Sequence, residues 1–156
     1  MALSASCVRM GGLRLALAMM LALLVVPGYV VAPVLFAKLD THTAGMVAGA
    51  VFHVSNLGVL LLGAAVAAFW MRLGATTWGL WTVLAVMLVL VCINAFVMAP
   101  VMQDLKDAAG NISALPADDA QRKQFGMLHG ISEVVHMLAS LLALWLVATG
   151  GRSQTS

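Results

Sequence analysis

Apolar residues dominate four long stretches of the chain, and short polar stretches separate them. The apolar stretches run over 13–36, 44–71, 78–99 and 125–148, and a loop over 100–124 precedes the last of them. Each stretch exceeds the ~20 residues that a helix needs to cross the hydrocarbon core of a bilayer. The pattern predicts a single all-α domain, an integral membrane four-helix bundle with both termini on the same side.

Prolines punctuate the first and third stretches. Pro27 and Pro33 lie within the first, where each withdraws an amide and leaves the carbonyl four residues earlier, here those of Leu23 and Tyr29, without its helical partner. Pro100 is expected to close the third stretch. We expect no internal repeat, because no convincing similarity between the two halves is evident, and this argues against alternating access built from repeats.

The last stretch, 125–148, carries polar and ionisable side chains despite its apolar character. An ionisable group at membrane depth is costly unless it faces protein or trapped water, so such residues are candidates for a functional site. With ~100° per residue they share one face of a helix, and with ~1.5 Å of rise per residue their depths match those of polar residues on the second and third helices. The candidate ligand-binding residues, which we expect to converge in one leaflet half, are His53, Asn56, Asn94, His129, Ser132, Glu133 and His136.

Composition agrees with a protein integral to the lipid bilayer. Hydrophobic residues make up 63% of the chain and charged residues 9%, whereas about 25% are charged in soluble proteins. The net charge is +2, and the basic residues are too dispersed for a nucleic-acid footprint. Arg9 and Arg14, which flank the first helix, favour termini in the cytoplasm. We expect a bacterial inner membrane as the location.

Glu133 is the only glutamate in the chain, and this restricts metal chemistry. A di-iron bundle needs two Glu-x-x-His motifs and two further glutamates, so that site is excluded. Candidates for a mononuclear metal site are His53, Glu133 and His136, and haem between His53 and His136 is a further alternative. The sequence requires no cofactor. It contains no nucleophile in a recognisable catalytic context and no phosphate-binding loop, so an enzyme is not favoured.

Short motifs spread over most of the chain resemble one known family. They are Ala32-Pro33-Val34-Leu35-Phe36, Ala44-Gly45 with Phe52, Asn94 with Pro100, and Phe125-x-x-Leu128-His129-x-x-Ser132. In these motifs the chain resembles the transmembrane protein 205-like family, a domain-of-unknown-function family of small four-span proteins. The resemblance implies a four-span fold and a membrane location, and it supplies no reaction or ligand. That family is expected to show an asparagine at the place of His136, so a metal role for His136 would not be a family property.

Two functional hypotheses follow from the polar face. In the first, the cluster binds a small cation, a metal or a polar ligand. In the second, the protein is a structural or assembly subunit of a membrane complex, and the cluster only specifies helix packing through interhelical hydrogen bonds of ~0.6 kcal/mol each. Small residues four apart, Gly45 with Gly49 and Gly63 with Ala67, permit close approach of another helix. Candidate partners for these faces are therefore a second copy or another membrane protein.

Overall fold

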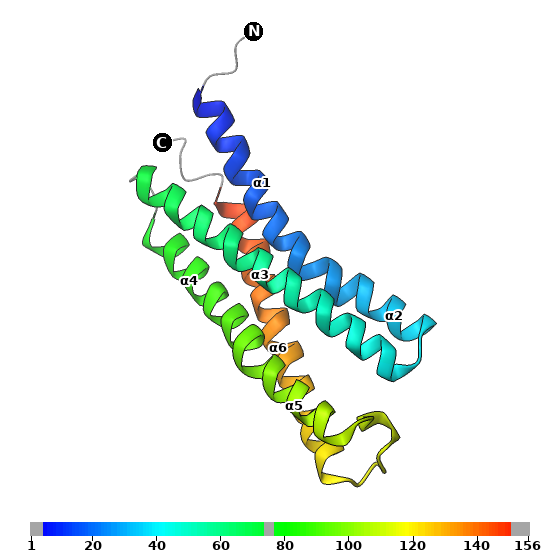
Figure 1. Ribbon diagram of the computed structural model, residues 1–156. Helices are drawn as coiled ribbons and strands as arrows, with labels where there is room; N and C mark the ends of the chain where they lie inside the picture. Colours follow the sequence, from blue (N-terminus) through cyan, green and yellow to red (C-terminus); the bar gives the residue numbers. More distant parts are fainter. Residues whose placement is uncertain (1–4, 74–76, 151–156) are drawn as a thin grey trace.

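Four long helical segments run antiparallel to one another and form one bundle (Figure 1). This computed structural model describes residues 5–73 and 77–150, and no strand is present within them. The segments are 30 to 32 residues long and apolar enough to cross a membrane. The chain enters and leaves the bundle at the same end. The prediction of an all-α, four-helix membrane bundle is thus confirmed.

The first helical hairpin contains a π-helical turn ahead of its second proline. It comprises α1 (Ala5–Val26), the π-helical turn η1 (Pro27–Val31), α2 (Ala32–Lys38) and α3 (Thr41–Leu73). A π turn inserts an extra residue into the helical ladder and shifts its hydrogen bonds. Because this turn starts at Pro27, which lacks an amide, the segment stays helical through both of its prolines.

The second helical hairpin has the same order of elements, and its proline does not end the helix as we had expected. Pro100 lies in the first turn of the next α-helical piece, where a missing amide needs no partner, so the helix continues to Ala109. The non-helical connection is correspondingly shorter than the loop predicted over 100–124. The elements are α4 (Trp78–Ile93), the π-helical turn η2 (Asn94–Met98), α5 (Ala99–Ala109), the 3₁₀ turn η3 (Ile112–Ala114) and α6 (Ala120–Thr149).

Aspartates cap the two helices that return through the bundle. Asp40 Oδ1 accepts a hydrogen bond of 3.0 Å from the Thr43 amide at the start of α3. Asp119 Oδ1 accepts bonds of 2.8 Å and 3.2 Å from the amides of Gln121 and Arg122 at the start of α6. The hydrogen bond from Thr43 holds the pKa of the Asp40 carboxyl below its ordinary value of 3.8. These caps satisfy amides that would otherwise lack partners in the first helical turn.

The apolar core fills the half of the bundle nearest the termini. There α1 packs against α3 and α6, and α4 packs against α6 and α3, so the four segments close into a ring. Trp70 and Trp81 meet edge to face with ring centroids 5.6 Å apart. This half offers no polar interior. Its buried side chains are Leu13, Leu17, Met20, Leu24, Val59, Val66, Trp70, Leu80, Leu84, Met87, Val91, Ala139, Ala143 and Leu146.

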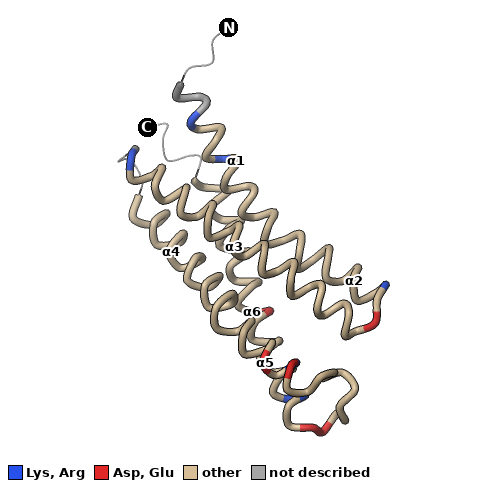
Figure 2. The backbone as a smooth tube through the Cα atoms, viewed as in Figure 1, with Lys and Arg blue, Asp and Glu red and all other residues tan. Residues whose placement is uncertain are grey.

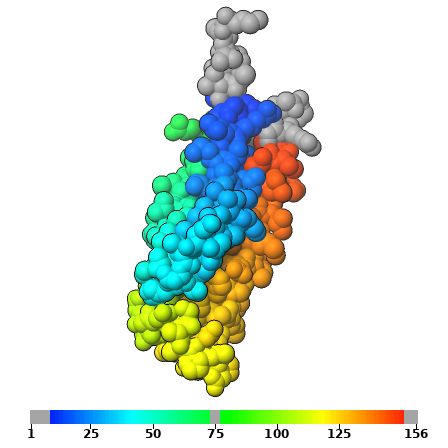
Figure 3. All heavy atoms as spheres, turned by 90° about the vertical axis from the view of Figure 1, so that its right-hand side faces the viewer, coloured from blue at the N-terminus to red at the C-terminus, as the bar shows by residue number. Residues whose placement is uncertain are grey.

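The two hairpins separate in the other half, which we call the loop-side half. Figure 1 shows α2 and the start of α3 diverging from α5 and the start of α6. α2 packs on η1 and α3 and not closely on α6. In Figure 3, α1 and α2 cover the middle of one face, α6 runs along its edge, and the α5–α6 connection projects beyond α2. We call the opening between Tyr29 of η1 and His129 and Glu133 of α6 the α2–α6 seam; all three side chains are exposed.

Candidate functional site

His136 is a buried residue that joins α6 to the first segment. It is 8% exposed, and its Nε2 lies 2.9 Å from the carbonyl oxygen of Leu24. A carbonyl oxygen can only accept, so Nε2 carries the hydrogen and donates it. The Phe52 ring meets the imidazole edge on, with centroids 5.2 Å apart. Gly28 completes the seat, because a Cβ there would lie only 3.0 Å from Nε2.

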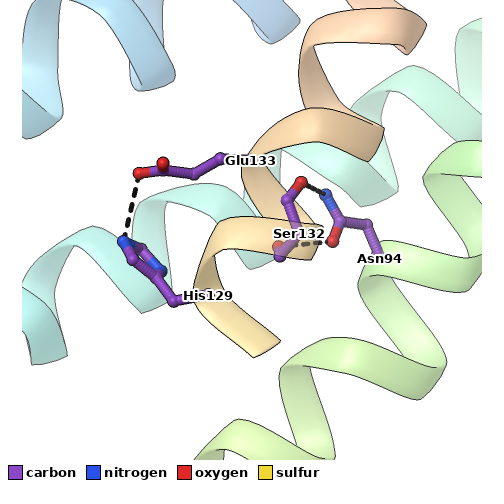
Figure 4. Close-up of polar contacts among 4 residues, drawn as sticks. All are labelled: Asn94, His129, Ser132 and Glu133. Atoms are coloured by element: carbon purple, nitrogen blue, oxygen red, sulfur yellow. Dashed lines mark hydrogen bonds and ion pairs between the residues drawn. The ribbon is translucent and has the colours of Figure 1, made fainter. Parts of the chain in front are cut away.

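Asn94 and Ser132 form a second polar contact between α6 and its neighbours (Figure 4). The Ser132 hydroxyl donates to Asn94 Oδ1 at 2.6 Å, and Asn94 Nδ2 donates to the Ser132 carbonyl oxygen at 3.3 Å. Asn94 is the first residue of η2 and is 8% exposed. The pair satisfies its own polar atoms inside the bundle, so these two residues and His136 account for their polarity by packing α6.

His129 and Glu133 project from the side of α6 opposite to Asn94 (Figure 4). His129 Nε2 lies 3.1 Å from Glu133 Oε1, and the two side chains are 51% and 69% exposed. Glu133 is close to the middle of the 30-residue α6 and so lies within the predicted span. Ionisable groups at that depth almost always face protein, a partner or water. The isolated bundle leaves this pair uncovered.

A row of side chains leads from the end of the bundle to this pair. Lys106 on α5 donates from Nζ to the carbonyl oxygen of Gly45 on α3 at 3.4 Å. The same Nζ lies 5.6 Å from the centroid of the Phe125 ring on α6, within the range of a cation–π contact. The Phe125 ring stacks on His129, with centroids 5.9 Å apart and planes 8° apart. The loop-side half therefore places an aromatic face next to an imidazole and a carboxylate.

The seven candidate residues do not line one shared pocket, which corrects the expected convergence. His53 lies on the exposed surface of α3, whereas Asn56 on the same helix is buried. No group of three or more His, Cys, Asp or Glu side chains in the described part of the chain could hold a metal ion, so His53, Glu133 and His136 are not assembled as a site. His136 also uses Nε2 on a protein carbonyl, which does not suit a haem ligand. Ligand binding by these residues stays a prediction.

The distribution of charge agrees with a bundle that spans a membrane. Figure 2 shows the charged positions gathered at the two ends of the bundle, with one acidic position on α6 between them. Within the apolar part of α6 that acid is Glu133. An apolar helical bundle with charged ends and four helices of membrane-spanning length defines a four-span integral membrane protein.

Within this class, the chain belongs to the family described as a domain of unknown function, DUF4149, whose model matches residues 15–111. The matched segment runs through both π turns and ends after α5, before α6 begins. No curated protein and no solved structure matches the chain. The predicted membership of a domain-of-unknown-function family is confirmed at that level.

Proposed function

We propose that this protein binds a cation at Glu133 in the α2–α6 seam. The observation that carries the proposal is the uncovered His129–Glu133 pair, with side chains 51% and 69% exposed near the middle of a membrane-spanning helix. A carboxylate there favours a positively charged ligand, because Coulomb attraction is stronger in a medium of low dielectric constant. His129 positions one carboxylate oxygen, and the other faces the seam.

The donor set favours a singly charged cation over a divalent metal. Structural and catalytic metal sites usually take three or more protein ligands, and the described residues assemble no such group of His, Cys, Asp and Glu. A singly charged cation can be held by one carboxylate together with aromatic faces. The rings of Tyr29 and Phe125 lie near this part of α6, against His136 and His129 respectively.

The finer placement of the protein also belongs to this proposal. Within its family we group the chain with the transmembrane protein 205-like proteins, on the motifs Ala32-Pro33-Val34-Leu35-Phe36 and Phe125-x-x-Leu128-His129-x-x-Ser132. We place it in a bacterial inner membrane with its termini in the cytoplasm. Arg9 and Arg14 support that orientation, because basic residues that flank the first helix usually set it.

A second candidate function is that of an assembly subunit whose α3 and α6 faces contact another membrane protein or a second copy. Gly49, Gly126 and Gly130 favour it, because a Cβ added at any of them would meet no atom within 4 Å. Exposed small residues permit close approach of a partner helix. In that arrangement the partner would cover Glu133 and supply the polar contact that the bundle lacks.

Dicyclohexylcarbodiimide tests cation binding at Glu133 directly. This apolar reagent reacts with protonated carboxyl groups that it reaches from lipid: the carboxyl oxygen adds to the carbodiimide carbon, the acid proton moves to nitrogen, and an acyl shift leaves a stable N-acylurea. Purified protein in lipid nanodiscs is labelled with and without potassium, ammonium or methylammonium chloride, and N-methylglucamine chloride keeps the ionic strength constant. Peptide masses then give the labelling rate at each carboxyl group.

We expect at least one of the three cations to slow labelling at Glu133 in proportion to its occupancy. Glu133→Gln should carry no label in the same peptide, and Asp119 in the loop serves as the internal control for reagent activity. Labelling at Glu133 that is unchanged by every cation, or that falls only in parallel with Asp119, would overturn the proposal.

A further inference from the structure

The two hairpins are repeats of one another, which corrects the expectation that the halves are unrelated. When the two π turns are aligned, residues 28–35 (GYVVAPVL) match residues 95–102 (AFVMAPVM) at four of eight positions, and the other four pairs are chemically similar. In each copy a π turn ends at an Ala-Pro pair that starts the next α-helical piece. The match is short and lies in apolar sequence, so the shared π turn makes it visible.

The helix contacts follow the same twofold relation. α1 packs against α3 as α4 packs against α6, and α1 meets α6 as α3 meets α4. η1 contacts α3 as η2 contacts α6. The repeats are parallel, related by an axis along the bundle, as in membrane proteins built from repeats of the same topology. The α2–α6 seam therefore has a counterpart between α5 and α3.

The counterpart seam is closed by a built-in cation. There the Lys106 ammonium reaches from α5 to the Gly45 carbonyl on α3 and lies over the Phe125 ring, and η2 and η3 also contact α3. In the alignment of the π turns, the position that corresponds to Lys106 is Leu39, which has no charge. Nothing in the described residues bridges the α2–α6 seam in this way, and Glu133 is exposed there.

From this difference we infer that the α2–α6 seam takes a cationic amphiphile, a molecule with an ammonium head on an apolar chain, as a lysine side chain is. This inference rests on the proposed cation binding at Glu133 and names the ligand class. Glu133 provides the opposite charge for the head, and the exposed apolar side chains of Val30, Val34 and Phe36 flank the opening for the tail. Lysine and alkylammonium groups share this division between apolar stem and charged head.

The geometry also fixes what the ligand does not do. Both seams lie in the loop-side half, because parallel repeats place equivalent features at the same depth, and the termini-side half is filled by the apolar core. Exchange between the two seams would not carry a ligand to the opposite surface. The ligand therefore enters and leaves from the bilayer.

Competition by n-decylammonium tests the ligand class. Carbodiimide labelling of Glu133 in nanodiscs is measured with n-decylammonium, methylammonium, potassium or n-decyl sulfate; the last has the same tail and an anionic head. We expect n-decylammonium to protect Glu133 at a concentration about tenfold or more below that of methylammonium, since each buried methylene adds to affinity. We expect n-decyl sulfate to give no protection.

The outcomes separate the ligand class from the underlying cation site. Equal protection by potassium, methylammonium and n-decylammonium overturns the amphiphile and leaves cation binding standing. Protection by n-decyl sulfate as strong as that by n-decylammonium shows shielding by the tail alone and also overturns it. Absence of protection by every cation overturns both proposals.

A substitution at the aligned position gives an independent check. Leu39→Lys supplies the α2–α6 seam with an ammonium like that of Lys106, and Leu39→Gln is the uncharged polar control at the same exposed site. We expect Leu39→Lys to slow labelling of Glu133 without any added amphiphile, relative to Leu39→Gln. Equal labelling rates in the two variants would overturn the correspondence between the seams.

Discussion

Replacing Gly28 with alanine should disrupt the seat of His136 and destabilise the bundle. The added Cβ would lie 3.0 Å from His136 Nε2 and 3.3 Å from its Cδ2, so the imidazole must shift away from the Leu24 carbonyl. A lost interhelical hydrogen bond costs ~0.6 kcal/mol in a membrane bundle, and an unsatisfied buried polar group costs about 1–3 kcal/mol. Against this, alanine gains up to about 1 kcal/mol over glycine in helix propensity.

The free energy of unfolding in detergent, from dodecyl sulfate titration followed by circular dichroism, measures the balance. Gly130→Ala is the matched control, because its Cβ meets nothing within 4 Å and reports propensity alone. We expect Gly28→Ala to be less stable than Gly130→Ala by about 1–3 kcal/mol. In a His136→Ala background that difference should disappear. Equal stability of the two alanine variants, or a difference that persists without His136, would refute the reasoning.

Three further predictions concern the polar contacts of α6 and the helix caps. Asn94→Ala and Ser132→Ala should each destabilise the bundle, with a coupling energy of about 0.6–1.7 kcal/mol in a double-mutant cycle, and strict additivity would contradict the reciprocal pair. Asp119→Ala should lower the free energy of unfolding by about 1 kcal/mol while Asp119→Asn changes it little, and equal losses would contradict the capping role. Because the folded pKa of Asp40 is lowered, its contribution to stability is present above pH 3.8 and is lost as the pH falls through the folded pKa. Melting curves of wild type and Asp40→Asn should therefore converge at low pH, and a constant offset would contradict the cap.

The fold could be predicted from the sequence because membrane-spanning length and apolar character are local properties. The effect of the prolines was harder to predict. Pro27 indicated a free carbonyl at Leu23, but the carbonyl that receives His136 is that of Leu24, next to a π turn. Likewise, Pro100 indicated a helix end, although it sits in the first turn of α5. A π turn depends on the neighbours that accept the altered hydrogen bonds, and periodicity does not report these.

The candidate residues could be found from the sequence, but their grouping could not. Helical periodicity places Ser132, Glu133 and His136 on one face of α6, and that face is nevertheless divided. Ser132 turns toward η2, His136 inserts beside η1, and Glu133 faces the α2–α6 seam because α2 diverges there. The divergence is a tertiary property. The internal repeat could have been found by comparing the two Ala-Pro pairs with their preceding aromatic and valine residues.

Access to Glu133 in native membranes tests the central claim most directly. Membranes that contain the full-length protein are treated with dicyclohexylcarbodiimide or with a water-soluble, membrane-impermeant carbodiimide, and the labelled peptides are identified by mass. An open α2–α6 seam predicts that Glu133 is labelled by the apolar reagent before any purification. A Glu133 that is labelled only after detergent extraction would show that a partner covers it in the membrane, and a Glu133 that is labelled in neither state would contradict its exposed position.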